Sequence, residues 1–82
     1  MMDYQHIVTR LIEILTPLAK GREVAETTEL AGQLALDSMQ VMGLIMAVED
    51  EFDISVPINA IAEVKTVRDF ALQIQKCMDP NP

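Results

Sequence analysis

The chain is organised around Leu34-Ala35-Leu36-Asp37-Ser38-Met39-Gln40-Val41-Met42, where a loop meets the start of a strongly apolar helix. Asp37 or Ser38 can cap that helix, because a short side-chain oxygen accepts a hydrogen bond from a free N–H of the first turn. Gln40 stands three residues after Asp37, as the second member of a capping box does. A helix N-terminus favours an anion, so a phosphate ester on the Ser38 hydroxyl would be stabilised there. Ser38 is therefore the candidate working residue.

Length and composition predict one small helical domain. The chain has 82 residues, which allows a single small core. Half of the residues are apolar, yet there are two Phe, one Tyr and no Trp, so the core must be aliphatic, which suits packed helices better than a sheet. We expect an all-α domain over residues 1–78, followed by a flexible C-terminal tail over residues 79–82.

The net charge indicates which classes of partner are favoured, and the cysteine content indicates the cellular compartment. Six Lys and Arg against thirteen Asp and Glu give a net charge of −7, which disfavours nucleic acid and anionic membranes and favours basic proteins. A single cysteine, Cys77, cannot form an internal disulfide, and no signal sequence opens the chain, so we expect a cytoplasmic protein. No apolar run approaches the roughly 18 residues that cross a bilayer.

Hydrophobic spacing predicts the helices. Residues 4–15 form an amphipathic helix that Pro17 should end, and residues 38–52 form a second helix. A long connection over residues 20–36 separates them, in which residues 25–30 can form a helical turn. Pro57 can open a short helix reaching about Val64, and Thr66 with Asp69 should cap a last helix. These elements make a small four-helix bundle with three longer helices, a short third helix and a long loop between the first two.

The second helix carries two apolar stripes. One stripe has the spacing of a core face and comprises Val41, Leu44, Ile45, Val48 and Phe52. The other side carries Met39, Met42 and Met46 with Gly43 and Asp50, and Ser38 lies at the border beside Glu49. Either this helix is buried on all sides or the methionines form an exposed surface for a partner, and we favour the second, since methionine adapts to varied partners. Gly43 would let a partner approach the backbone closely.

Several residues invite a functional interpretation that the pattern does not favour. His6 has no Cys or second His at metal-ligand spacing, so no metal site is predicted. Cys77 falls on the apolar stripe of the last helix and is interpreted as structural. Acids cluster at residues 49–53, where they oppose the helix dipole, and attraction of a basic enzyme is one explanation. The chain has no nucleophile elbow or phosphate loop, so we expect no catalytic activity of its own.

Two segments together resemble the acyl carrier protein family. Leu36-Asp37-Ser38-Met39 is followed, at the family's spacing, by Glu49-Asp50-Glu51-Phe52-Asp53-Ile54-Ser55-Val56-Pro57, and Lys65-Thr66-Val67-Arg68-Asp69-Phe70 resembles the family's entry into its last helix. The resemblance implies that Ser38 receives 4′-phosphopantetheine from coenzyme A, delivered by a magnesium-using phosphopantetheinyl transferase that recognises the adjacent Asp37. An acyl group would be bound as a thioester to the terminal thiol of this arm. The carrier would bring it from a loading ligase or synthase to acyltransferases.

The resemblance also implies an acyl-binding space between the second and third helices. Its candidate lining residues, which core packing explains equally well, are Val41, Ile45, Ile61, Val64 and Phe70.

The sequence departs from the family where partners dock. Gln40 and Gly43 stand where acids are common in fatty-acid carriers, and the third helix is similarly poor in acids. The candidate docking residues are Met39, Met42, Gly43, Met46, Glu49 and Asp50. We therefore expect a carrier of fatty, polyketide or related acyl groups that serves a specialised pathway rather than housekeeping fatty-acid synthesis. We also expect it to be a monomer. The alternatives are an aminoacyl or peptidyl carrier, and an unmodified helical domain that binds a partner through its methionines.

Overall fold

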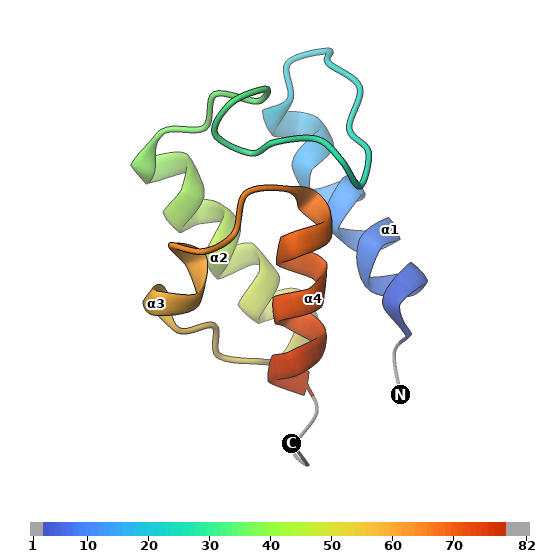
Figure 1. The fold of residues 1–82 in the computed structure, drawn as a ribbon, viewed down its shortest axis with the longest axis vertical. Helices are drawn as coiled ribbons and strands as arrows, with labels where there is room; N and C mark the ends of the chain where they lie inside the picture. Colours follow the sequence, from blue (N-terminus) through green and yellow to red (C-terminus); the bar gives the residue numbers. More distant parts are fainter. Residues whose placement is uncertain (1–2, 79–82) are drawn as a thin grey trace.

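The computed structural model describes residues 3–78 and forms a helical bundle of 37 × 24 × 20 Å (Figure 1). The helices are α1 (Tyr4–Leu15), a short 3-10 helix η1 (Thr16–Leu18), α2 (Ser38–Phe52), α3 (Ile58–Ile61) and α4 (Val67–Met78). The predicted all-α bundle, with three longer helices, a short third one and a long loop after the first, is confirmed.

Helix α1 begins and ends where local chemistry requires. The Asp3 side chain accepts a hydrogen bond from the His6 backbone N–H at 2.9 Å and caps the first turn. Pro17 falls in η1, directly after α1 ends at Leu15, as its missing N–H predicts. Helix α1 packs against α4 and α2, and its buried apolar residues are Ile7, Val8, Leu11 and Leu15.

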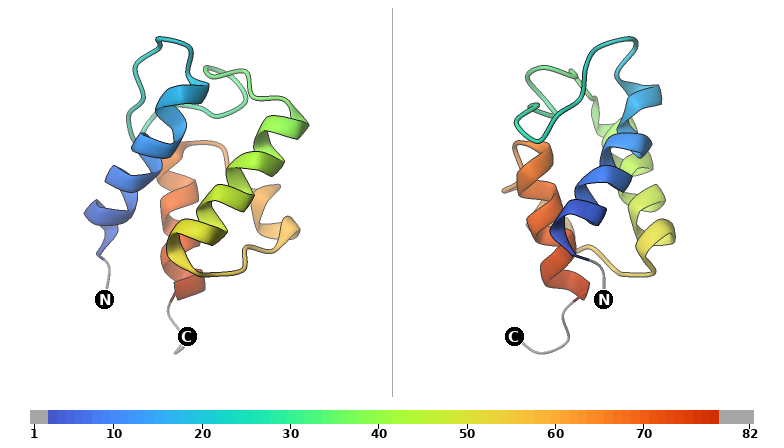
Figure 2. Two further views of the ribbon diagram at one scale, coloured as in Figure 1. Left: turned by 180° about the vertical axis from the view of Figure 1, so that it is seen from behind. Right: turned by 90° about the vertical axis from the view of Figure 1, so that its right-hand side faces the viewer.

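Helices α2 and α4 run in the direction opposite to α1 and complete the core (Figure 2). Four of the five core positions predicted for α2 are buried, and Val41 is half-buried at the edge of the core. The Thr66–Asp69 cap of α4 is confirmed. Asp69 N–H donates to Thr66 Oγ1 at 3.2 Å, and Asp69 Oδ2 accepts from the N–H groups of Thr66 and Lys65 at 3.2 and 3.1 Å. These bonds hold the pKa of the Asp69 carboxyl below its usual value.

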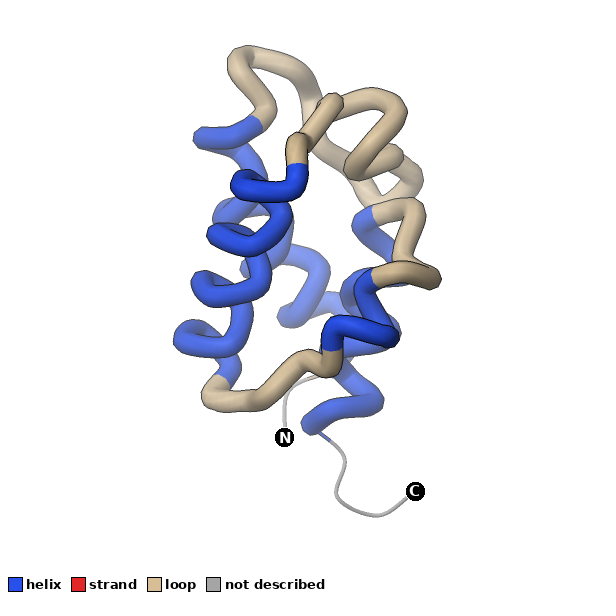
Figure 3. The backbone as a smooth tube through the Cα atoms, turned by 90° about the vertical axis from the view of Figure 1, so that its left-hand side faces the viewer, coloured by secondary structure: helices blue, strands red, loops and turns tan. Residues whose placement is uncertain are grey.

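The long connection before α2 is tied to the start of α4 (Figure 3). Leu30 N–H donates to the Lys65 carbonyl at 2.9 Å and Val67 N–H to the Thr28 carbonyl at 3.0 Å, around an antiparallel bridge between Glu29 and Thr66. Of the helical turn expected over residues 25–30, the structure has one hydrogen-bonded turn, in which the Thr28 N–H donates to the Ala25 carbonyl at 3.1 Å. It contains no helix, because the rest of the segment pairs with the backbone at the start of α4.

The third helix is shorter than expected. Pro57 precedes it as the N-cap residue rather than opening it, and the α-helix covers Ile58–Ile61. Single turns continue the chain to Val64, whose N–H donates to the Ile61 carbonyl at 3.1 Å. No described helix is long and apolar enough to span a membrane. The tail predicted over residues 79–82 lies outside the described residues.

Candidate functional site at the start of helix α2

Asp37 and Gln40 form the capping box that the sequence predicts. Asp37 Oδ1 accepts from the Gln40 N–H at 2.8 Å, and Gln40 Oε1 accepts from the Asp37 N–H at 3.1 Å. Asp37 is therefore the N-cap and Ser38 the first residue of α2. The box satisfies the N–H groups at both its ends and leaves those of Ser38 and Met39, which have no acceptor within the helix.

The loop that leads to Ser38 is fixed by two buried leucines, one on each side of a residue in the left-handed conformation. Leu34 and Leu36 are buried, whereas Ala35 between them has φ of 53°. Because a left-handed alanine is unfavourable, the two leucines must hold it in place. The sequence pattern indicates both anchors, but no residue type at position 35 signals the left-handed turn.

Ser38 is exposed, and its surroundings suit a phosphate ester. Ser38 is at the positive end of a 15-residue helix, and the N–H groups of Ser38 and Met39, which have no acceptor within the helix, favour an anion there. The Asp37 carboxylate is adjacent, but one of its oxygens is occupied by the Gln40 N–H. The residues present thus fit a covalently attached phosphopantetheine group, which would project from the loop end of the bundle.

The methionine side of α2 is open to solvent. Met39, Met42 and Met46 are 84%, 51% and 67% exposed. Gly43 is exposed among them, and a Cβ atom added there would meet no atom within 4 Å other than those of its chain neighbours and the backbone of its own helix. The alternative of a helix buried on all sides is wrong, because the bundle covers only its other face. We call the set Met39, Met42, Gly43 and Met46 the methionine face.

Two of the acids at the end of α2, Glu49 and Glu51, have partners within the chain. Glu49 Oε2 accepts from the Val56 N–H at 2.8 Å, and Glu51 receives two hydrogen bonds from Arg10, at 3.1 and 2.7 Å. The bonds from Arg10 hold the pKa of Glu51 below its usual value. These contacts join α2 to the next loop and to α1, and sequence reasoning missed them. Asp50 is exposed and forms no ion pair with any described residue.

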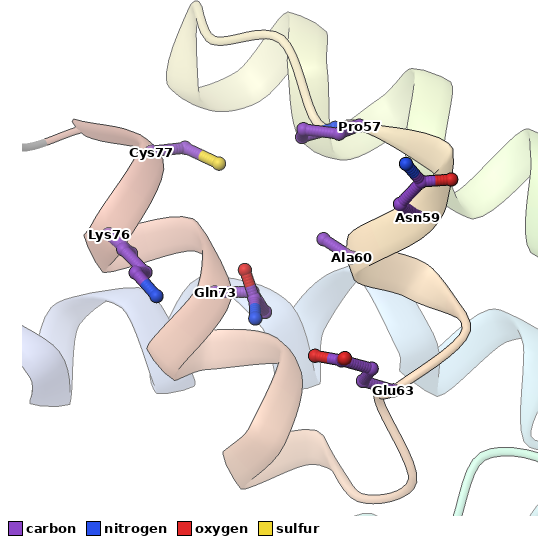
Figure 4. A pocket seen from close by; sticks show the side chains of 7 residues that line it. All are labelled: Pro57, Asn59, Ala60, Glu63, Gln73, Lys76 and Cys77. Atoms are coloured by element: carbon purple, nitrogen blue, oxygen red, sulfur yellow. The ribbon is translucent and has the colours of Figure 1, made fainter.

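The candidate acyl-lining residues are divided between core and edge. Phe70 and Ile45 are buried, whereas Val41, Ile61 and Val64 are half-buried and pack against the core. A shallow groove of about 380 Å³ lies elsewhere, between α3 and α4, and includes none of these residues. Figure 4 shows its lining side chains, among them Cys77, whose thiol points toward the groove from the last turn of α4. Cys77 is half-buried.

Among the described residues, no three His, Cys, Asp or Glu side chains are grouped as a metal site would require.

Comparison with known proteins agrees with this geometry. A family model described as "Phosphopantetheine attachment site" matches residues 7–74. The chain belongs to the acyl carrier protein family. The matched region includes Ser38 and all of α2, so the phosphopantetheine cofactor predicted from the sequence is confirmed for the family.

Two curated relatives carry the family name. A "Probable acyl carrier protein" of Caulobacter vibrioides is 39% identical over 54 residues, which cover 66% of this chain and 63% of the relative. A "Putative acyl carrier protein, mitochondrial" of Schizosaccharomyces pombe is 27% identical over 74 residues, which cover 90% of this chain and 66% of the relative. The chain thus spans slightly less than two thirds of these relatives. Since one of them is named mitochondrial, the cytoplasmic location stays a prediction.

A solved acyl carrier protein from Thermotoga maritima has the same fold. It superimposes with a TM-score of 0.75 at 24% identity, over 94% of this chain and 92% of the other. The family consists of carrier proteins to which a phosphopantetheine cofactor is attached.

Proposed function

We propose that this chain carries an acyl group as a thioester on a 4′-phosphopantetheine arm attached to Ser38. The observation that carries the proposal is the exposed Ser38 as first residue of α2, held by the Asp37–Gln40 box. A transferase would join the Ser38 oxygen to the phosphorus of the phosphopantetheine half of coenzyme A. The pyrophosphate bond would break, adenosine 3′,5′-bisphosphate would leave, and the hydroxyl proton would pass to a base of the transferase. The arm supplies a flexible tether ending in a thiol, and the chain itself catalyses no reaction.

In this proposal, partner enzymes dock on the methionine face and on the two acids predicted with it, Glu49 and Asp50. Ser38 lies on the same helix at the edge of this face, so an enzyme that reaches its hydroxyl or the arm must cover neighbouring residues. The three methionines offer an adaptable apolar contact. The partners are a phosphopantetheinyl transferase, a loading ligase or synthase, and acyltransferases of a specialised pathway. The carrier is a monomer that binds these enzymes one after another.

An acyl chain on the arm would fold back between α2 and α3. Val41, Ile61 and Val64 are half-buried against the core and can separate at less cost than fully buried residues. Ile45 and Phe70 would form the floor of the space. Chemical shifts of their side chains should change on acylation of the arm, whereas Leu11, buried in α1, should change little. Equal shifts at all positions would argue against a space at this place.

Mass spectrometry of the intact protein tests the proposal. The purified chain is incubated with coenzyme A, Mg²⁺ and a broad-specificity phosphopantetheinyl transferase, and one phosphopantetheine group should be added. The Ser38→Ala variant should gain nothing, whereas Ser55→Ala, which removes the second and likewise exposed serine, should gain as much as the wild type. No gain in the wild type, or an equal gain in Ser38→Ala, refutes the proposal.

A further inference from the structure

Glu49 binds three backbone N–H groups of the loop that joins α2 to α3. Its carbonyl oxygen accepts from Asp53 and, at 3.2 Å, from Ile54, and its carboxylate Oε2 accepts from Val56 at 2.8 Å. The first two bonds end the helix around the left-handed Asp53, as a C-terminal cap does. The third bond comes from the side chain and reaches the residue just before Pro57, the N-cap of α3. Glu49 thus connects α2 to the start of α3.

Helix α3 is held mainly at its two ends. The most extensive helix contacts within residues 3–78 are those of α1 with α4, η1 and α2, and α3 takes part in none of them. Its N-cap residue, Pro57, makes no side-chain cap hydrogen bond. Beyond α3, the chain is fixed again where the Lys65 carbonyl accepts from the Leu30 N–H at 2.9 Å. At the start of α3, the Glu49–Val56 bond and the burial of Val56 in the core perform this task.

Glu49 lies in line with two of the proposed acyl-lining residues. Val41, Ile45 and Glu49 are spaced four residues apart, so their side chains follow one another along one side of α2. Val41 is the member of this line closest to Ser38, and Glu49 lies about 12 Å further along the helix, at 1.5 Å per residue. An acyl chain that enters from Ser38 and follows this line would therefore reach the Glu49–Val56 bond last.

We propose that Glu49 is a positioning residue that limits the length of the acyl chain which the carrier can enclose. The inference rests on the proposed function, because the space between α2 and α3 receives a chain only from an arm on Ser38. Each CH₂ group that enters this space is stabilised by leaving water. A chain that reaches the end of the space can continue only if the start of α3 moves away from α2. That movement breaks the part-buried bond between Glu49 and Val56 and opposes further entry.

The gain in melting temperature on acylation measures how much of a chain is enclosed. A transferase that accepts acyl-coenzyme A attaches arms with butanoyl, octanoyl, dodecanoyl and hexadecanoyl groups, and each form is compared with the same protein carrying an unacylated arm. In the wild type the gain should grow with chain length and then level off. In Glu49→Ala it should continue to grow, so that the longest chains give a gain several degrees larger than in the wild type. A merely structural role would lower the melting temperatures of all forms and leave the gain unchanged.

Two variants serve as controls. Glu49→Gln keeps an acceptor for the Val56 N–H and should level off at the wild-type chain length. Glu51→Ala removes the same charge two residues further on and breaks a contact with Arg10 of α1 instead. It should lower the stability of every form without changing the chain length at which the gain levels off.

The outcomes separate this inference from the proposed function. If the wild type gains no mass at Ser38 with coenzyme A and transferase, the carrier function fails. If the wild type is modified but its gain in melting temperature is absent or never levels off, the length limit alone is refuted. The limit is also refuted if Glu49→Ala levels off at the wild-type length. A gain that Glu49→Ala loses at every length would equally overturn it, since the bond would then support the space rather than limit it.

Hydrogen exchange in the wild type tests the same movement without a substitution. The Val56 N–H should exchange at one slow rate while the chain fits the space, because its bond to Glu49 is intact. With chains beyond the length at which the melting temperature levels off, its exchange should accelerate several-fold, whereas the Leu30 N–H, bonded to Lys65, should not change. Equal exchange of the Val56 N–H with all chains would refute the proposal.

Discussion

Asp37 and Gln40 exchange two hydrogen bonds across the first turn of α2, at 2.8 and 3.1 Å. These bonds fix the backbone on both sides of Ser38, whose hydroxyl is the proposed attachment point. Asp37→Ala should lower the free energy of unfolding by about 0.5–2 kcal/mol, since it removes an N-cap. Asp37→Asn keeps a capping oxygen and should stay close to the wild type in urea unfolding.

The same pair of variants tests recognition of the Asp37 charge. If the transferase recognises the Asp37 carboxylate, it should attach phosphopantetheine to Asp37→Asn more slowly than to the wild type, although the stability of the variant is retained. Equal arming rates would limit Asp37 to its capping role.

Glu49 and Asp50 are adjacent acids with different environments. Glu49 accepts the Val56 N–H, and Glu49→Ala should lower the free energy of unfolding by about 1.5–3 kcal/mol, the usual contribution of a hydrogen bond to a charged group. Glu49→Gln keeps an acceptor and should lose less. Asp50→Ala should change stability by less than about 0.5 kcal/mol, as exposed substitutions do. Urea unfolding of the three variants checks this, and a large loss in Asp50→Ala would show an internal role that the structure does not contain.

The exposed methionines should act in partner binding rather than in folding. Met42→Glu should leave the fold intact and weaken binding of the transferase, because it places a carboxylate in an apolar contact. Leu72→Glu is the matched control, since Leu72 is 46% exposed, comparable to Met42 at 51%, but lies on α4. Titration calorimetry of both variants measures the effect. Equal weakening by the two substitutions would point to net charge rather than to the methionine face.

Binding through this face should depend weakly on salt. An apolar contact is not screened by ions, whereas an array of exposed ion pairs is. The affinity for the transferase should therefore change little between about 0.05 and 0.5 M salt, a range in which the screening length falls well below 10 Å. A steep loss of affinity would mean that the acids dominate docking.

Asp69 should contribute to the acid sensitivity of the fold. The backbone N–H groups of Thr66 and Lys65 lower its pKa in the folded state, so its stabilising effect is complete above the ordinary carboxyl value of 3.8. As the pH falls below that value, the unfolded chain takes up the proton first and the stabilisation is lost. Asp69→Asn should flatten this part of the stability profile, measured by thermal unfolding between about pH 5 and pH 2. An unchanged profile would assign the acid sensitivity to other carboxyl groups.

Local sequence signals predicted much of this fold, and the reasons are physical. Pro17, the Asp37–Gln40 box and the Thr66–Asp69 cap each act within one helical turn, so their partners are visible in the sequence. The projection of α2 separated its core side from Met39, Met42 and Met46, because helical periodicity alone determines which side chains share a face.

Contacts between distant segments could not be predicted in the same way. The hydrogen bond from Leu30 N–H to the Lys65 carbonyl joins backbone groups, which carry no residue-specific signal. The bond between Glu49 and the Val56 N–H depends on how the chain turns after α2. The groove beside Cys77 is lined by residues of two segments, the turn of α3 and the second half of α4, so it cannot be predicted from either segment alone.

Locating the arm on the chain tests the central claim most directly. Trypsin cuts after Arg22 and Lys65 and leaves the segment between them intact, so Ser38 and Ser55 occur in one peptide, residues 23–65. Fragmentation of this peptide from the armed protein therefore has to assign the added mass to one of the two serines or to a threonine. We predict that every modified peptide carries phosphopantetheine on Ser38. Modification at Ser55, Thr27 or Thr28, or an unmodified peptide after complete incubation, would contradict the account.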